Sequence, residues 1–147
     1  MHLPSLLAVV AASVSASACT FGVMSEYHSN SADGSTGGSC KLLLWHDDLG
    51  DTWPWDGNHK NEFSTDLSCS KGCDTFEYQG RSWEVCHSIL PPHKAEVTDA
   101  TYMDLRQTDN SGDVISIWPG GEFKDYSSNS PFNSFVGNYF WRSGIGC

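Results

Sequence analysis

Six cysteines constrain the fold of this chain more than any other feature of its sequence. They lie at Cys19, Cys40, Cys69, Cys73, Cys86 and Cys147. An even number of cysteines in an exported protein indicates a framework of disulfide bonds, although spacing alone does not choose among the possible pairings. Two of the six lie near the ends of the mature chain, where a crosslink would restrain segments that otherwise fray. We therefore expect three disulfides and no free thiol.

The N-terminal segment indicates that the chain is exported. Residues 3–14 are almost entirely apolar, and Ala16-Ser17-Ala18 places small side chains one and three positions before a cleavage point. Signal peptidase prefers this pattern, so we expect residues 1–18 to be a cleaved signal peptide and the mature chain to begin at Cys19. The apolar run is too short to cross a hydrocarbon layer of about 30 Å. We expect a secreted, extracellular protein with no membrane partner.

Length and charge limit what the mature protein can be. The 147 residues less the 18 of the signal leave 129, which is enough for one domain. The 18 Asp and Glu residues against 8 Lys and Arg residues give a formal net charge of −10. This charge repels phosphate backbones, so nucleic acid is not expected as a partner. We expect an acidic monomer.

Composition divides the mature chain into two parts. Residues 25–39 (SEYHSNSADGSTGGS) are rich in Ser and Gly and have no apolar periodicity. This composition is typical of a flexible segment. We expect residues 19–39 to form a flexible polar N-terminal arm and residues 40–147 to form the folded domain.

Short extended segments predict a β-rich fold for residues 40–147. Residues 74–79 and 82–90 flank a Gly80-Arg81 turn, and residues 100–107 and 113–118 flank a loop containing Asn and Gly, as in two hairpins. Further strands are expected at 41–46, 122–126 and 135–141, and a helix competes only over 95–106. We predict a mainly β domain, a small antiparallel sandwich or compact barrel stapled by three disulfides.

The most informative chemistry lies in the acidic, aromatic stretch 45–66. This stretch contains six carboxylates and only one Lys or Arg residue, Lys60. Three interpretations stay open: a solvated surface loop anchored by a buried Trp, a calcium site built from carboxylate oxygens, or a glycan-binding or glycan-cleaving cleft in which an indole stacks on a sugar ring. The candidate binding residues are Asp47, Asp51, Trp53 and Trp55. No residue is assigned a catalytic role.

Other patterns for catalysis or metal binding are weak. The Cys69-x3-Cys73 pair, with Cys86 and His87, could bind zinc only through free thiolates, and paired cysteines offer none. Arg81 and Glu84 would point to opposite faces of one strand, so with His87 they do not make a ready-made site of the kind found in secreted ribonucleases. The sequence has no Gly-x-Ser-x-Gly elbow. We expect no metal, no cofactor and no catalysis.

A signal ending in Ala16-Ser17-Ala18, a short mature chain, six cysteines including the last residue, and a Ser/Gly-rich segment occur together here. In these features the chain resembles the small secreted cysteine-rich proteins of fungi, many of which are effectors or toxins. The resemblance implies a virulence protein that acts without catalysis, by binding a host or competitor protein or a cell-wall glycan. The alternative is a small extracellular glycan-binding module or glycan hydrolase that uses loop 45–66. A groove with two inward carboxylates near Trp53 and Trp55 would favour the alternative, and a flat or convex surface would favour the binding protein.

Overall fold

The computed structural model describes residues 17–90, 97–109 and 112–147. In these residues the chain forms strands and connecting loops, with no helix. The strands are β1 (Ala18–Asn30), β2 (Thr36–Trp45), β3 (Phe63–Leu67), β4 (Gly72–Tyr78), β5 (Arg81–His87), β6 (Met103–Gln107), β7 (Ile115–Trp118), β8 (Glu122–Asn129) and β9 (Asn133–Gly146). Accordingly, the described part of the chain holds no helix long and apolar enough to cross a membrane. Most of the expected signal peptide, residues 1–16, lies outside the described residues.

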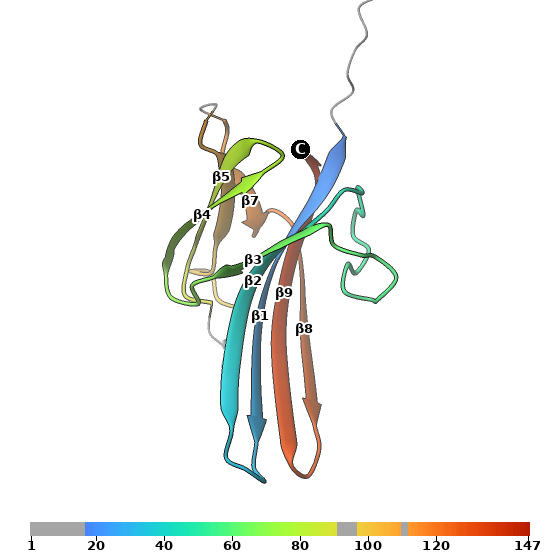
Figure 1. Ribbon diagram of the computed structural model, residues 1–147, viewed down its shortest axis with the longest axis vertical. Helices are drawn as coiled ribbons and strands as arrows, with labels where there is room; N and C mark the ends of the chain where they lie inside the picture. The colour runs from blue at the N-terminus through green and yellow to red at the C-terminus, as the bar shows by residue number, and fades with distance from the viewer. Residues whose placement is uncertain (1–16, 91–96, 110–111) are drawn as a thin grey trace, which may run out of the picture.

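The strands form two antiparallel sheets that face each other. Sheet A has the order β3-β2-β1-β9-β8, and sheet B has the order β4-β5-β6-β7. Strand β1 pairs with β2 on one side and with the last strand, β9, on the other, so the two ends of the described chain lie together in the middle of sheet A (Figure 1). The prediction of a mainly β domain built from antiparallel strands is confirmed.

Residues 19–39 do not form a flexible arm. They make up nearly all of β1 and the start of β2, and Ser25 pairs with Cys40 on one side and with Asn138 on the other. Strands β1 and β2 form a hairpin, and its far half has solvent on both faces: no residue in 26–39 is buried. This exposure is why the prediction was wrong. A strand with no core face carries no apolar alternation, and alternation is the signal that sequence analysis relies on.

The two hairpins expected in sheet B are confirmed, and the first turn lies one residue earlier in the chain than expected. Strands β4 and β5 are joined by Gln79 and Gly80, whose φ angles are 51° and 73°, while Arg81 already pairs with Tyr78. Positive φ at both positions is the geometry of a type I′ turn, which matches the twist of the flanking strands. Strands β6 and β7 form the second hairpin, and β6 takes in the last four residues of the stretch 95–106 where a helix competed.

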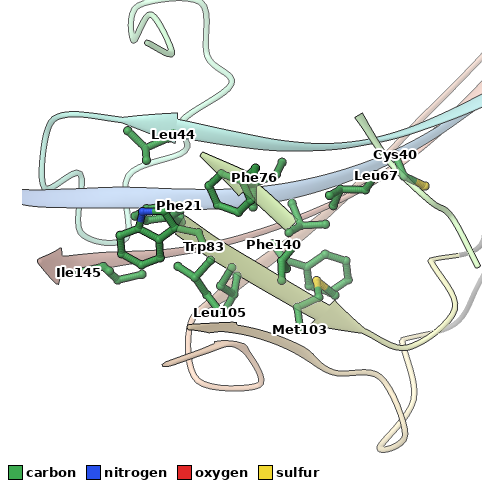
Figure 2. Close-up of a cluster of buried hydrophobic side chains, with 14 of the residues drawn as sticks. Phe21, Cys40, Leu44, Leu67, Phe76, Trp83, Met103, Leu105, Phe140 and Ile145 are labelled. Atoms are coloured by element: carbon green, nitrogen blue, oxygen red, sulfur yellow. The ribbon is translucent and has the colours of Figure 1, made fainter. Parts of the chain in front are cut away.

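The inner faces of the two sheets meet in one apolar core. Phe21 and Phe140 of sheet A face Trp83, Leu105 and Met103 of sheet B (Figure 2). The Phe21 and Trp83 ring centroids lie 5.2 Å apart. Burying a large side chain of this kind contributes about 1.5–3 kcal/mol. The sandwich therefore has a conventional packed interior where the two sheets overlap.

Three disulfides close the fold, as expected, and the described residues include no free cysteine. The pairs are Cys19–Cys147, Cys40–Cys69 and Cys73–Cys86. The first joins the start of β1 to the end of the chain, the second ties β2 to the loop before β4, and the third crosslinks the β4–β5 hairpin. Three disulfides are typical of a protein that folds and works in an oxidising environment.

Candidate functional site

The acidic, aromatic loop folds back over the outer face of sheet A, the face turned away from sheet B. Its Trp53 and Trp55 pack on Trp45, Tyr139 and Trp141 of strands β2 and β9. Ring centroids in this outer aromatic cluster lie between 4.9 Å (Trp53 and Tyr139) and 6.1 Å (Trp55 and Trp141). The cluster is a second, smaller core on the far side of the sheet.

Hydrogen bonds hold the first half of the loop against the strands. The hydroxyl of Thr20 donates to the Asp47 carbonyl at 2.8 Å and accepts from the Leu49 amide at 3.0 Å. The carbonyl of Gly50 accepts from the Trp141 indole at 3.3 Å and from the Ser143 hydroxyl at 3.0 Å. Thr20 is fully buried. The loop is therefore a fixed part of the fold.

The indoles of this cluster pack largely against one another. Trp45 and Trp141 are only 2% and 4% exposed, and the Lys124 ammonium lies 4.4 Å above the ring of Trp53. The indole nitrogens of Trp45 and Trp55 are buried without a hydrogen-bond partner in the described structure, so packing alone holds these rings. This geometry favours the hypothesis of a surface loop anchored by Trp over that of an open stacking platform for sugars.

A buried tyrosine joins the cluster to strand β1. The Tyr139 hydroxyl donates to a Glu26 carboxylate oxygen at 2.6 Å. Burial, followed by the hydrogen bond to Glu26, raises the pKa of Tyr139 well above its usual range. The phenol consequently stays protonated as a donor at any physiological pH.

The carboxylates of the loop are spread over the surface. Asp47 and Asp51, the two acidic residues predicted to bind, are exposed, as is Asp48. The carboxylate of Asp56 accepts from the Asn58 side chain at 2.9 Å and from the Asn58 amide at 2.8 Å, and these bonds lower the pKa of Asp56. Asp56 is thus engaged in a local turn.

One groove of about 300 Å³ borders the loop. Two carboxylates, Asp48 and Glu122, line it together with Arg142 and one edge of Trp141, whereas Asp47 and Asp51 do not line it. Glu122 comes from β8, about seventy positions along the chain from the loop. Sequence analysis missed Glu122 because no local pattern could indicate that β8 runs beside the loop.

A polar cluster around His46 also went unrecognised in the sequence. Its Nε2 lies 2.5 Å from the Tyr78 hydroxyl and 2.9 Å from the Gln79 amide nitrogen, and a Glu62 oxygen is 3.8 Å away. Burial and then the charge of Glu62 raise the pKa of Tyr78. These contacts join the end of β2 to the β4–β5 turn, so they clamp the two sheets at one end.

His87, which the sequence analysis weighed with Arg81 and Glu84 and set aside, is fully buried. Its Nδ1 lies 2.8 Å from the Ser88 carbonyl, and its Nε2 lies 3.3 Å from Asp74 Oδ2. Glu84, on the opposite face of β5, pairs with Arg106 at 2.6 Å. The structure therefore does not bring Glu84 and His87 into one site.

Cysteine and carboxylate clusters in the described chain do not provide thiolate ligands. The groups with metal-like spacing are Cys19, His46 and Cys147, and Cys73, Glu84 and Cys86. Every cysteine in them is in a disulfide, and a disulfide sulfur is not the thiolate that zinc requires.

A different feature of the surface is the far end of sheet A, which extends beyond sheet B. We call residues 26–39 and 125–136 the overhang: it consists of the two hairpins that run together away from the sandwich (Figure 1). No residue of the overhang is buried. It carries two of the most exposed large hydrophobic side chains in the described structure, Phe132 at 62% and Tyr126 at 52%.

The overhang is ordered by hydrogen bonds at its tips as well as by strand pairing. Both the amide and the hydroxyl of Ser31 donate to the Phe132 carbonyl, at 2.8 and 3.3 Å, so the two hairpin tips are joined. The Asp33 carboxylate accepts from the Ser35 amide at 2.8 Å, and this bonding to Ser35 lowers the pKa of Asp33. Side chains on the overhang are consequently presented from a preorganised backbone.

No family model, curated protein or solved structure matches this chain. Function is therefore argued from its own side chains. Of the predicted site residues, Trp53 and Trp55 come together in the outer aromatic cluster, and Asp47 and Asp51 stay apart from the groove. The overhang was missed because its polar sequence is that of a flexible segment, and only the exposed Phe132 near a Pro could have drawn attention to it.

Proposed function

We propose that this protein is exported and acts outside the producing cell as a non-enzymatic binding protein, using the overhang to dock onto a host or competitor protein. The observation that carries the proposal is the overhang itself. A sheet that extends past its partner buries little apolar surface there, so core packing gives no reason for its length. Exposed aromatic side chains on such a surface are typical of an interaction site.

The contacts of the overhang suit an anchor residue. Phe132 projects from a hairpin tip, and on one face the rings of Tyr126 and Phe135 lie 6.0 Å apart. Because the tips are fixed by hydrogen bonds before binding, little conformational entropy is lost when a partner docks. Aromatic anchors that fill a partner's pocket commonly dominate the binding free energy.

Charge narrows the chemistry of the partner. The overhang contains Glu26, Asp33 and Asp125 but neither Lys nor Arg, within a chain of net charge −10. Complementary potentials speed association and suppress wrong partners. The expected partner is therefore a protein surface with basic groups around an apolar pocket, and its binding should weaken as salt is raised.

The test compares matched variants of the oxidised mature protein. Phe132→Ser removes the exposed ring at the tip, and Val114→Ser removes a side chain that is 60% exposed directly before β7, a strand of sheet B and not of the overhang. Fluorescently labelled proteins are titrated onto intact fungal, plant and animal cells, with and without protease treatment of the cell surface. We expect saturable binding that Phe132→Ser weakens by about thirtyfold, the cost of losing a hot-spot side chain of about 2 kcal/mol.

Val114→Ser should bind as the parent protein does, and protease treatment should remove the binding sites. Equal binding by Phe132→Ser and Val114→Ser would contradict docking through the overhang. Binding that survives protease but is lost after glycosidase treatment, or binding to anionic lipid vesicles, would contradict a protein partner.

Glycan binding is the second candidate, and the groove beside the loop is the observation that favours it. Asp48, Glu122 and Arg142 offer hydrogen bonds to sugar hydroxyls along one wall. A glycan array with the parent protein and with Glu122→Gln distinguishes the two candidates. Recognition of a defined glycan that is lost in Glu122→Gln and kept in Phe132→Ser would place function in the groove.

A further inference from the structure

A separate cavity lies between the sheets where sheet B ends and the overhang begins. It has a volume of about 350 Å³. The most buried of its lining residues, Ser25, Leu90, Asn138 and Phe140, form the floor, and the exposed ones, Lys71, Ile89, Thr98 and Ala100, form the rim. The cavity thus has a buried floor and an exposed rim.

The walls of this cavity are held in place before any ligand arrives. The Leu90 amide donates to the Cys69 carbonyl at 2.8 Å, beside the Cys40–Cys69 disulfide. The Ser88 amide donates to the Tyr102 carbonyl at 3.0 Å, and the Tyr102 amide donates to the Ser88 hydroxyl at 3.2 Å. A preformed, mainly apolar cavity is the usual form of a small-molecule site.

One polar side chain on the cavity floor stands out. Asn138 is 7% exposed and lines the cavity, so its side-chain amide lies at the floor of a mainly apolar pocket. Phe140 is the next residue of β9 on the same inner face, and Ser25 is the residue of β1 that pairs with Asn138. A polar side chain at the floor of a mainly apolar pocket is the kind of group that orients a small ligand and makes its binding specific.

The size and lining of the cavity indicate the ligand class. A cavity of about 150 Å³ holds one benzene ring, so this cavity of about 350 Å³ accommodates roughly two fused rings. The Asn138 amide offers both donor and acceptor atoms at the floor. We propose that this cavity binds a small, mainly apolar molecule of about two rings whose hydroxyl or carbonyl group hydrogen-bonds to Asn138.

This site is distinct from the overhang, and its test uses two probes that differ by one hydroxyl group. 2-Naphthol and naphthalene are titrated into the oxidised mature protein, and binding is followed by calorimetry and by the side-chain amide resonance of Asn138 in NMR spectra. We expect 2-naphthol to bind about five- to tenfold more tightly, the ratio set by one net hydrogen bond. The Asn138 resonance should shift with 2-naphthol.

Three variants make the test specific. Asn138→Leu should abolish the preference for 2-naphthol while naphthalene still binds, and it should be at least as stable as the parent because it removes a buried amide. Ala100→Trp, at the exposed rim, should block both probes. Asn129→Leu, an exposed position on β8, should change neither affinity.

The outcomes that overturn the proposal are equally defined. Absence of binding by the parent protein rejects the cavity as a ligand site. Equal affinities for the two probes, or a preference that survives Asn138→Leu, rejects the role of Asn138. Binding that survives Ala100→Trp shows that the probes bind elsewhere.

Discussion

Gly22 offers a sharp test of the outer aromatic cluster. It lies in the middle of β1 on the outer face, beneath the indoles of Trp55 and Trp45. A Cβ at this position would lie 2.6 Å from Trp55 Cη2 and 2.9 Å from Trp45 Cζ3. Carbon atoms make favourable contact at about 3.5–4.0 Å. Gly22→Ala therefore requires the indoles to move by about 1 Å, away from their packed neighbours.

The expected cost follows from two opposing effects. Overpacking destabilises by about 1–3 kcal/mol. Replacing Gly by Ala also stabilises by about 0.4–1 kcal/mol, because it restricts the unfolded chain. We expect Gly22→Ala to lower the free energy of unfolding by about 1–2 kcal/mol, which lowers Tm by roughly 4–8 °C. Urea unfolding followed by tryptophan fluorescence measures the change, with an unaltered m-value.

Two comparisons isolate the cause. Gly72→Ala is the matched control in β4, since the nearest atom to its added Cβ is 4.0 Å away, and it should not lower stability. Trp55→Phe removes the closest ring atoms, so the double variant with Gly22→Ala should be about 1 kcal/mol more stable than the two single changes predict together. Stability of Gly22→Ala equal to that of the parent, or strict additivity in the double variant, would refute the packing of Trp55 on β1.

Three further predictions concern the loop, the buried tyrosine and the disulfides. Trp53→Ala and Trp55→Ala should each lower the free energy of unfolding by about 3 kcal/mol, because both indoles are packed in the cluster. Asp47→Asn and Asp51→Asn should change the free energy of unfolding by no more than about 0.5 kcal/mol, and urea titration measures both effects. Because the pKa of Tyr139 is raised in the folded state, the folded protein keeps the Tyr139 proton at alkaline pH values where the unfolded chain loses it. The free energy of unfolding should therefore be unaffected by this group below about pH 10 and should fall above that pH by up to about 1.4 kcal/mol per pH unit. Tyr139→Phe should flatten this alkaline slope, and an unchanged slope would count against the buried phenol. The disulfides Cys19–Cys147, Cys40–Cys69 and Cys73–Cys86 close loops with sequence separations of 128, 29 and 13 residues. Replacing each pair by two Ser residues should lower the free energy of unfolding by about 5, 3.6 and 3 kcal/mol in that order. Thermal unfolding that shows the reverse order would contradict loop-closure entropy as the main source of their stabilisation.

The sequence by itself determined the features that depend on local pattern and composition. Six cysteines, together with an expected export signal, predict three disulfides, and alternation around a Gly-containing turn predicts the β4–β5 hairpin. These predictions are confirmed because a hairpin turn and a two-residue periodicity are set by neighbours in the chain. The absence of helical periodicity likewise predicts a β fold.

Only the tertiary structure decided which distant segments meet. Cysteine pairing depends on where strands lie in space, and Cys19 meets Cys147 because β1 and β9 are neighbours in sheet A. The pairing of β8 with β9 brings Glu122 to the acidic loop, and the pairing of β1 with β9 places Asn138 beside Ser25 at the floor of the cavity. Residues 19–39 were mistaken for a flexible arm because residues 26–39, which are not buried, have the polar composition of a loop. Their order comes from strand hydrogen bonds, between β1 and β9 and between β1 and β2, that no local pattern encodes.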